Sequence, residues 1–292
     1  MHALVRRDAP ELEALGLVAH RGDITERAGV RDALRGIERL FHAAAWYRVG
    51  VRDRTPAYRI NVEGTRTVLE CARDLGVAKI VYTSTIAVFG DTRGRVVDER
   101  YRSGPPFLSE YDRTKWLAHY EVAEPLARGG LPVVIVQPGV VYGPGDHSPM
   151  AGVLDRYRRR RLPAVPARTA YCWGHVDDTV DGHVRAMEKG RGGDSYILAG
   201  PPHTLAEALR IAESVSGIPA PRVQLPPALL RLAARASELV GGDGEGLRVA
   251  AGVTYLGSSA KAERELGFRA RPLRDGFAEL FAGGSASGDR SG

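Results

Sequence analysis

The stretch AKIVYTST, residues 78–85, reads as a buried strand that ends in hydroxyl side chains. β-branched and aromatic residues dominate it, which favours an extended, half-covered or covered strand. A second run of this kind, LPVVIVQPG at residues 131–139, follows a segment with helical periodicity at residues 108–128. Near-continuous apolar strands separated by helices predict a parallel sheet with helices on both faces.

The same alternation continues on both sides of this unit. Before it, we expect strands at residues 2–6, 17–23 and 37–45, and helices at 9–15, 24–36 and 54–75. After residue 145 the pattern loosens into a smaller lobe, with helices expected at 150–161, 204–216 and 226–240 and a strand at 195–200. The last ten residues, GGSASGDRSG at 283–292, read as a disordered tail.

Composition narrows the class of protein. Of the 292 residues 43% are hydrophobic and 26% are charged, as in ordinary globular chains, and no apolar run reaches the length of a membrane span. Only Cys71 and Cys172 are present, without metal-ligand spacing, which favours the reducing cytoplasm. The helix expected at 226–240, PPALLRLAARASELV, has two interpretations: it lies on a membrane surface, or it packs within the lobe. We expect that it packs within the lobe.

Net charge is +6, and only four of the 41 basic residues are lysine. The densest run, RYRRRRLP at residues 156–163, has the charge of a nucleic-acid footprint, but no recognised binding motif accompanies it. A solvated helix end explains it equally well. We therefore expect a small-molecule substrate and neither a nucleic-acid nor a membrane partner.

Tyr111 and Lys115 stand four apart in YDRTK, on one face of the helix expected at 108–128. A phenol has a pKa of ~10, and a neighbouring ammonium favours the phenolate and lowers that pKa. Such a tyrosine can exchange a proton with a substrate hydroxyl or carbonyl. Thr85, at the end of its strand, has a hydroxyl suited to hold the reacting oxygen, and Ser84 is the neighbouring alternative.

Further polar and small residues follow other strand ends, where parallel sheets bind ligands. Small residues end FHAAA at Ala43, Ala44 and Ala45, so a flat ligand can approach the backbone there. RGD ends at Asp23, suitably placed for an adenine amino group, and Asn61 opens NVEGT on the next helix.

In this order, the stretches FHAAAWYRVG, NVEGTRTVLE, YDRTK, PGVVYGPGD, GHVDDTVDGHVRAMEKG and SSAKAERELGFRARPL resemble the extended short-chain dehydrogenase/reductase family. The resemblance runs from residue 2 to about residue 280. It is greatest to the dihydroflavonol-reductase-like branch, which includes hopanoid-associated sugar epimerase-like proteins. The family belongs to the NAD-dependent epimerase/dehydratases.

The resemblance implies a doubly wound, Rossmann-like parallel sheet. Residues 1–145 would be a dinucleotide-binding domain, and residues 146–282 mainly a substrate-binding lobe with some returns to the sheet. It implies catalysis by Thr85, Tyr111 and Lys115, with Lys115 also on the nicotinamide ribose. The implied cofactor contacts are Arg6, Arg7, Asp23, Ile24, Ala43, Ala44, Ala45, Asn61, Thr83, Tyr111, Lys115, Pro138, Gly139, Val140 and Val141. Family members often form homodimers, which makes a homodimer an expectation by analogy.

Arg6 and Arg7 bear on which dinucleotide is bound. NAD-preferring relatives end the second strand in an acid that binds the ribose hydroxyls, and here that place falls on Val5, followed by the two arginines. A 2′-phosphate needs cations at this point. We therefore expect NADP(H) over NAD(H).

Two departures from the family argue against a nucleotide-sugar substrate. Val140 stands where epimerases and dehydratases carry an Asn, and TAYCWGHVDD lacks the Arg that holds the diphosphate. The substrate residues that we expect are Trp46, Tyr47, Ala87, Tyr142 and Trp173, although each aromatic could equally be core packing. His175, Asp177 and Asp178 lack a metal-ligand set and are expected to cap the next helix.

The family's glycine-rich loop between the first strand and first helix has no counterpart in this sequence. In the strand order 3-2-1-4-5-6 that first strand is central, so strands at 2–6 and 37–45 would lack their shared neighbour. Unpaired buried backbone groups cost about 1–3 kcal/mol each, so the chain from Met1 is expected to fold poorly. We expect that Met1 is a misplaced start and that the natural protein continues upstream; an in-frame stop codon close before Met1 would exclude this.

Together these observations predict an NAD(P)-dependent oxidoreductase acting on a carbonyl or secondary alcohol of a small organic molecule. A sugar or nucleotide-sugar epimerase or dehydratase is the alternative among enzymes. A non-catalytic dinucleotide-fold scaffold or sensor is the alternative outside them.

Overall fold

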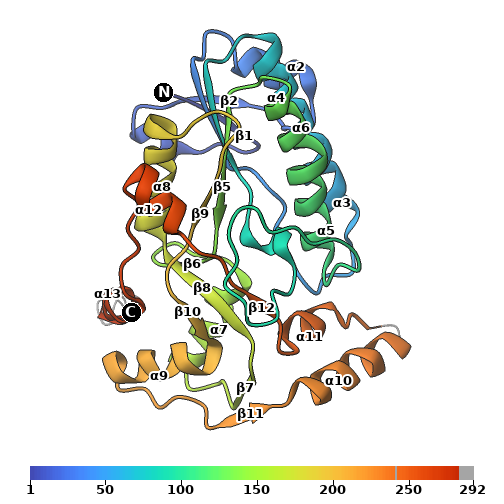
Figure 1. Ribbon diagram of the computed structural model, residues 1–292, viewed down its shortest axis with the longest axis vertical. Helices are drawn as coiled ribbons and strands as arrows, with labels where there is room; N and C mark the ends of the chain where they lie inside the picture. The colour runs from blue at the N-terminus through green and yellow to red at the C-terminus, as the bar shows by residue number, and fades with distance from the viewer. Residues whose placement is uncertain (241, 283–292) are drawn as a thin grey trace, which may run out of the picture.

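The computed structural model describes residues 1–240 and 242–282 (Figure 1). The tail expected at 283–292 lies outside these residues. A four-stranded parallel sheet of order β3-β4-β5-β9 forms the centre, and its strands are β3 (Arg39–His42), β4 (Lys79–Thr83), β5 (Val133–Pro138) and β9 (Ser195–Leu198). The predicted α/β class with a parallel sheet is confirmed, and β4 is the strand expected at 78–85.

The helices that follow the first strands lie close to the predicted ranges. On the N-terminal side they are α1 (Pro10–Ala14), α2 (Arg27–Ala33), α3 (Thr55–Tyr58), a π-helical turn (Arg59–Gly64), α4 (Thr65–Asp74), a 3-10 turn (Ile86–Phe89), α5 (Glu110–Leu117), a second π-helical turn (Ala118–Ala123) and α6 (Glu124–Arg128). On the C-terminal side they are α7 (Pro149–Arg158), α8 (Val176–Lys189), α9 (Leu205–Ser216), α10 (Pro227–Leu239), α11 (Glu245–Ala250), α12 (Ala260–Leu266) and α13 (Leu273–Ala282).

Side chains of the central sheet alternate between two apolar cores. Ile80, Tyr82 and Ile135 face a core built with α2, α4 and the α5–α6 segment, whereas Val81 and Val134 face a core built with α8 and α12. This alternation of period two follows from strand geometry. Because both faces are covered, the strands are apolar along their whole length, which is the pattern that the sequence displayed.

The first two strands, β1 (His2–Val5) and β2 (Val18–Arg21), pair in parallel with each other as a separate sheet. Within the described residues no strand lies between β1 and β3. Phe41 on β3 is 48% exposed, which agrees with an open edge on that side. The described residues thus form two separate parallel sheets here, and the expectation of a missing shared strand, with its cost in stability, stays a prediction.

The lobe is built on short strands at the carboxyl end of the central sheet. They are β6 (Val140–Tyr142), β7 (Ala164–Pro166), β8 (Ala170–His175), β10 (Pro202–Thr204), β11 (Val223–Leu225) and β12 (Thr254–Tyr255). β8 pairs with β6, β10 and β12, and β7 pairs with β11. α9 and α13 pack on this lobe, and α10 lies at its edge (Figure 1). The domain boundary at residue 145 stays a prediction.

Candidate active site

Thr85 and Tyr111 meet at the carboxyl end of the central sheet. Thr85 follows β4 in an extended conformation and begins a 3-10 turn, and its Oγ1 accepts a hydrogen bond of 3.2 Å from the Ala87 backbone nitrogen. Tyr111 lies in the first turn of α5, whose N-cap Ser109 accepts from the Asp112 nitrogen. The Thr85 side chain lies close enough to the Tyr111 hydroxyl to act on its pKa.

The pKa of Tyr111 is raised above its usual value, chiefly by burial and next by the neighbouring Tyr47, while the hydrogen bond with Thr85 opposes the rise. Burial acts in this direction because it penalises the charged phenolate. At neutral pH Tyr111 is therefore a neutral phenol, and can give a proton.

Lys115 lies one turn further along α5 and is buried. Its Nζ donates to the Thr83 carbonyl at 2.8 Å and to the Tyr82 hydroxyl at 3.3 Å, and burial lowers its pKa to about 7. We expected Lys115 to lower the pKa of Tyr111. The structure differs, because the pKa of Tyr111 is raised and the ammonium is bound to Thr83 and Tyr82.

Ser84, the alternative to Thr85, points its hydroxyl elsewhere. Its Oγ lies 2.7 Å from Nδ1 of His119, whose Nε2 lies 3.5 Å from a Glu124 carboxylate oxygen. Ser84 and His119 are both buried. The structure therefore leaves Thr85 as the hydroxyl beside Tyr111.

Asn61 has its polar atoms engaged within the protein. Its Oδ1 accepts from the Trp46 nitrogen at 2.7 Å, and its Nδ2 donates to the Trp46 carbonyl and to Thr114 Oγ1. Asn61, predicted as a cofactor contact, thus ties the loop after β3 to α5. Thr83 is similarly engaged, since its Oγ1 lies 3.0 Å from His183 Nε2.

Several predicted cofactor residues follow the carboxyl ends of β3 and β5. Ala43, Ala44 and Ala45 are exposed there, which leaves the backbone open to a flat ligand. Val140 and Val141 form β6, and Gly139 precedes them against the Cys172 carbonyl, where a Cβ atom would collide. Pro138 ends β5.

Arg59, which the sequence did not single out, lies near Asp23 at the expected adenosine end of the cofactor site. Burial alone would raise the pKa of Asp23, but hydrogen bonds from Thr25 and the charges of Arg59 and Arg6 hold it below its usual value. Arg6, Arg7 and Arg59 are exposed. Ile24 packs on Gly64, where a side chain would clash. Contacts of these residues with the adenosine end of the cofactor stay a prediction.

Tyrosines gather around Asp112 on the other side of Tyr111. The Tyr47 and Tyr111 rings are 4.5 Å apart, the Tyr171 ring stacks on Tyr255 at 6.2 Å, and the Tyr255 hydroxyl donates to Asp112 at 2.9 Å. Burial raises the pKa of Asp112 to about 7. The sequence analysis missed Asp112, Tyr171 and Tyr255, although Tyr171 stands within the TAYCWGHVDD motif.

A cavity of about 460 Å³ opens beside this group, and Ala87, Tyr101, Phe107 and Asp112 are among its lining residues. Ala87 is thus at a cavity wall, as a substrate residue would be. Trp46 is buried, and its backbone is held by Asn61. The cavity therefore lies next to the 3-10 turn that follows Thr85.

Tyr142 and Trp173 occupy a different place from the one expected. Both are almost fully buried in the lobe core, where their rings pack against Phe277. The Trp173 indole nitrogen donates to the His203 carbonyl. These two aromatics are core residues, because β6 and β8 turn them toward α13, and Trp173 touches the tyrosine group through an edge contact with the Tyr171 ring at 6.1 Å.

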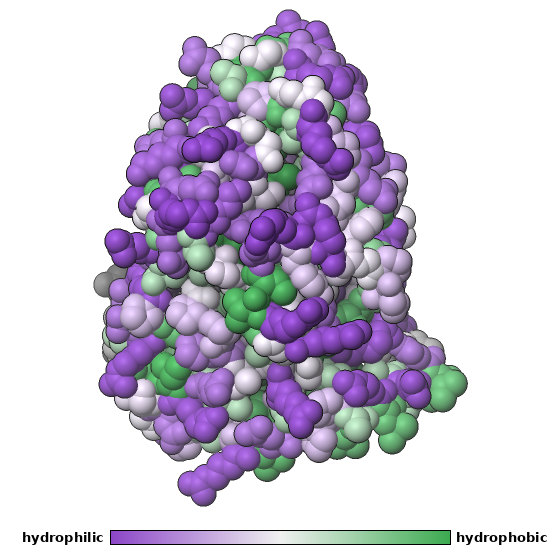
Figure 2. Space-filling model, viewed as in Figure 1, coloured by the Kyte–Doolittle hydropathy of each residue, from purple (hydrophilic) through white to green (hydrophobic). Residues whose placement is uncertain are grey.

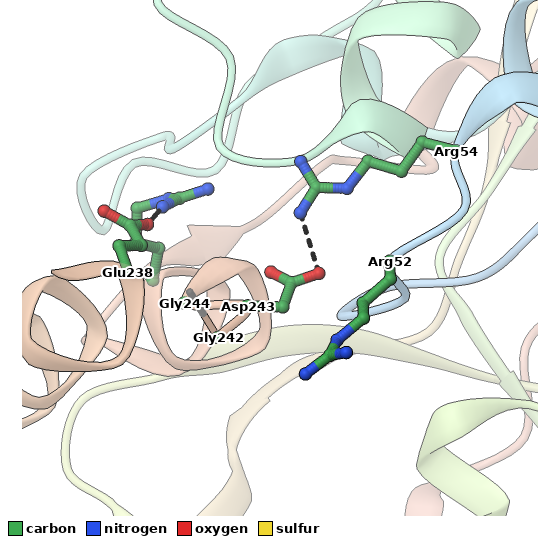
Figure 3. A pocket seen from close by; sticks show the side chains of 7 residues that line it. Arg52, Arg54, Glu238, Gly242, Asp243 and Gly244 are labelled. Carbon is green, nitrogen blue, oxygen red and sulfur yellow. Dashed lines mark hydrogen bonds and ion pairs between the residues drawn. The ribbon is translucent and has the colours of Figure 1, made fainter. Parts of the chain in front are cut away.

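A carboxylate from the lobe reaches the start of α5. Glu245, on α11, accepts from the Glu110 nitrogen at 2.5 Å and from the Gly50 nitrogen at 2.8 Å, and its side chain is fully buried. Beside it, Arg54 pairs with Asp243 at 2.7 Å in a hollow of about 380 Å³ (Figure 3). The loop after β3, α5 and α11 are thereby joined.

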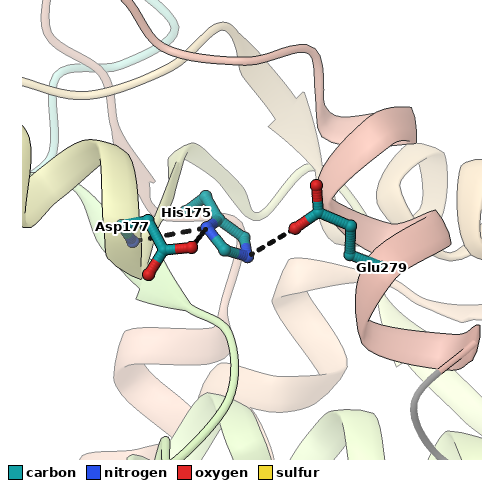
Figure 4. A group of neighbouring side chains, drawn as sticks. All are labelled: His175, Asp177 and Glu279. Atoms are coloured by element: carbon teal, nitrogen blue, oxygen red, sulfur yellow. Dashed lines mark hydrogen bonds and ion pairs between the residues drawn. The ribbon is translucent and has the colours of Figure 1, made fainter.

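His175 acts as the N-cap of α8, since its Nδ1 accepts from the Asp177 nitrogen at 3.3 Å. Its Nε2 lies 3.7 Å from a Glu279 oxygen, on the opposite side of the ring from Asp177 (Figure 4). Arg271 pairs with Glu279 at 2.7 Å and with Asp178 at 2.8 Å. The ring nitrogens therefore face separate carboxylates, one of which already has a cationic partner.

Comparisons with known proteins give the family of this chain. The family model described as NAD dependent epimerase/dehydratase family matches residues 1–199. The chain is 33% identical to "Sterol demethylase protein B" of Methylococcus capsulatus over 79% of its length and 71% of that protein. It is 32% identical to the "4-hydroxy-2-methyl-3-oxo-4-farnesyl-3,4-dihydroquinoline-1-oxide ketoreductase" of Stigmatella aurantiaca, over 93% and 85% of the two chains.

Among solved structures, "Crystal structure of gox2253" superposes with a TM-score of 0.87 at 30% identity, covering 98% of this chain and 90% of that one. The sequence resemblance is thus confirmed, and so is the class of enzyme: an NAD-dependent oxidoreductase or epimerase of the extended short-chain type. This chain belongs to the NAD-dependent epimerase/dehydratase family.

Proposed function

We propose that this protein is an NADP(H)-dependent reductase of a carbonyl, or dehydrogenase of a secondary alcohol, on a small apolar molecule. The observation that carries the proposal is the pairing of Thr85 with a neutral Tyr111 at the end of the sheet. A neutral phenol is an acid, so it suits proton delivery to a carbonyl oxygen.

The proposed roles follow from the contacts. When bound, the nicotinamide supplies or accepts the hydride. Thr85, whose Oγ1 accepts from Ala87, turns its hydroxyl proton from Tyr111 to the substrate oxygen when the substrate binds. Tyr111 Oη gives its proton to the same oxygen, and the buried Lys115 ammonium holds the ribose hydroxyls from its position on the Thr83 carbonyl. In the reverse direction Tyr111 takes the proton back.

Arginines at the adenosine end support the preference for NADP(H). Arg6 and Arg59 both act on Asp23, so positive charge exceeds negative charge at this carboxylate, and Arg7 is exposed next to Arg6 in the chain. A 2′-phosphate is held well by guanidinium groups because they donate in pairs. Family membership gives a nicotinamide dinucleotide, and these arginines favour the phosphorylated form.

The tyrosine group favours an apolar substrate over a nucleotide sugar. Tyr171 comes from the segment in which nucleotide-sugar enzymes carry a diphosphate-binding Arg, and here its ring stacks on Tyr255. Tyr47 offers a further flat surface against Tyr111. A relative named for a farnesyl-bearing ketone agrees with a carbonyl on a largely apolar molecule. Both cysteines are free and buried, which fits the cytoplasm.

Cofactor and substrate assays test the proposal. Fluorescence titration with NADPH and NADH measures binding, and a panel of aryl and alkyl ketones is then followed by NADPH absorbance. We expect net NADPH oxidation with at least one ketone. An epimerase recycles its cofactor and would give sugar isomers without net oxidation, and binding of neither dinucleotide would favour the scaffold or sensor.

A further inference from the structure

Helix α10 carries apolar side chains on two of its faces. Leu230 and Ala234 are buried, and the helix packs against α11. A second row is open to solvent: Leu229 is 51% exposed, Leu232 65% and Leu239 87%. Packing within the lobe, as expected from the sequence, therefore accounts for only one of the two faces.

The three exposed leucines form one stripe, because residues three, seven and ten apart return to the same side of a helix. Figure 1 shows α10 at the edge of the lobe, and Figure 2 shows apolar surface gathered at that edge. Apolar patches on otherwise polar surfaces mark interaction sites. The stripe of Leu229, Leu232 and Leu239 is such a patch.

A row of arginines flanks the stripe. Arg231 and Arg235 are four apart and exposed, and neither makes an ion pair with any residue that the structure describes. Arg231 donates only to the Ala251 carbonyl, at 3.3 Å. Free guanidinium groups beside an apolar stripe are typical of helices that lie in a membrane interface.

A hollow of about 490 Å³ lies at the N-terminal end of α10. Arg168 and Arg231 line it together with Pro227, Ala228 and Gly252, and its lining contains no acidic residue. Arg168 is exposed and makes no ion pair within the described chain. The hollow therefore offers two guanidinium groups to an anion of phosphate size, immediately beside apolar side chains.

We propose that α10 docks on the surface of an anionic phospholipid bilayer. The leucine stripe enters the acyl boundary, Arg231 and Arg235 meet headgroups, and the hollow at Arg168 and Arg231 holds one lipid phosphate. None of the described helices is long and apolar enough to cross a bilayer, so α10 lies in the plane of the interface.

Charge decides between a bilayer and a second copy of this chain. In a symmetric pair built on α10, the unpaired Arg231 and Arg235 would face their own copies, on a chain whose net charge is already +6. An anionic lipid surface instead attracts each of these groups.

Vesicle flotation tests the proposal with the whole chain. We expect binding to vesicles of phosphatidylcholine mixed with phosphatidylglycerol, weak binding to phosphatidylcholine alone, and loss in high salt. The double substitution Leu232→Ser/Leu239→Ser should weaken binding by roughly tenfold or more, and Arg168→Gln/Arg231→Gln should weaken it and flatten its salt dependence. The matched control is Val96→Ser/Val180→Ser, which replaces valines that are 53% and 56% exposed elsewhere and should bind as before.

Three outcomes would overturn the proposal. Equal binding by the leucine variant and the parent would remove α10 from the contact. Thermal stabilisation by inorganic phosphate, lost in Arg168→Gln/Arg231→Gln without any vesicle binding, would make the hollow a site for a free anion. A dimer in sedimentation velocity that Leu232→Ser/Leu239→Ser dissociates, again without vesicle binding, would assign the stripe to self-association. Circular dichroism of every variant excludes misfolding as the cause of a loss.

Discussion

The carboxylate of Glu245 lies 2.5 Å from the backbone nitrogen of Glu110, the first residue of the helix that carries Tyr111. The first turn of a helix has nitrogens without partners inside the helix, and a carboxylate there also complements the helix dipole. Glu245 accepts from the Gly50 nitrogen as well, so one side chain of the lobe fixes the start of α5 and the loop after β3.

Replacing Glu245 by alanine is expected to destabilise the protein and slow turnover. Two backbone nitrogens would lose their acceptor, at about 1–3 kcal/mol each, and Tyr111 would lose its fixed position one residue away. Denaturant unfolding and steady-state kinetics measure the two effects. Glu245→Gln is the matched variant: it keeps an acceptor oxygen and should lose less of both. Full turnover in Glu245→Ala would show that catalysis does not need the contacts of Glu245 with these two nitrogens.

Tyr111→Phe is expected to lower kcat by about 10²–10⁴-fold, the range of general acid catalysis, because only the proton-donating hydroxyl is removed. Cofactor affinity, measured by fluorescence titration, should stay within about twofold, since the ring remains. Tyr58→Phe is the control, because Tyr58 is an exposed tyrosine stacked on Arg113 outside the proposed site. Turnover by Tyr111→Phe at the parental rate would remove the proposed role of this phenol.

Much of the frame could be predicted from the sequence because its signals are local. The strand at residues 78–85 and the helix at residues 108–128 are continuous patterns, so Thr85 and Tyr111 could be placed at a sheet end and on a helix. Glu245 could not be found this way, since its partner is 135 residues away and no local pattern links them. Lys115 shows the other limit: the spacing from Tyr111 was visible, but the Thr83 carbonyl that holds its ammonium lies on another element.

Aromatic residues illustrate the same difference between pattern and place. Tyr142 and Tyr171 both stand in family motifs, and composition treats them alike. In the structure Tyr142 is in the core beside Phe277, while Tyr171 stacks on Tyr255 near Asp112. Tertiary pairing decides which side chains of a short lobe strand face the site. A strand of three to six residues is too short for its sequence periodicity to show this.

The double variant Arg6→Ser/Arg59→Ser is expected to raise KM for NADPH by about tenfold or more and to leave KM for NADH nearly unchanged. The proposed contacts are to the 2′-phosphate, which NADH lacks, and charge-assisted bonds to phosphate are the stronger kind. Arg191→Ser, a substitution of an exposed arginine at the end of α8, is the control. An equal rise in KM for both cofactors would place these arginines on a part that NADPH and NADH share.

Lys115 should make the stability of the cofactor-free protein depend on pH. Burial lowers its pKa from 10.5 to about 7, so between these values the unfolded chain binds the proton and the folded chain does not. The free energy of unfolding should therefore rise with pH from about 7 toward 10.5, by up to about 1.4 kcal/mol per pH unit. Below about pH 7 the folded chain carries the buried charge, and the full cost of burying it then lowers the stability. Lys115→Met removes the titrating group, so its unfolding free energy should follow a flatter curve over pH 7–9, below the region where tyrosines titrate. Urea unfolding at a series of pH values compares the two proteins, and parallel curves would mean that the ammonium is solvated in the folded chain.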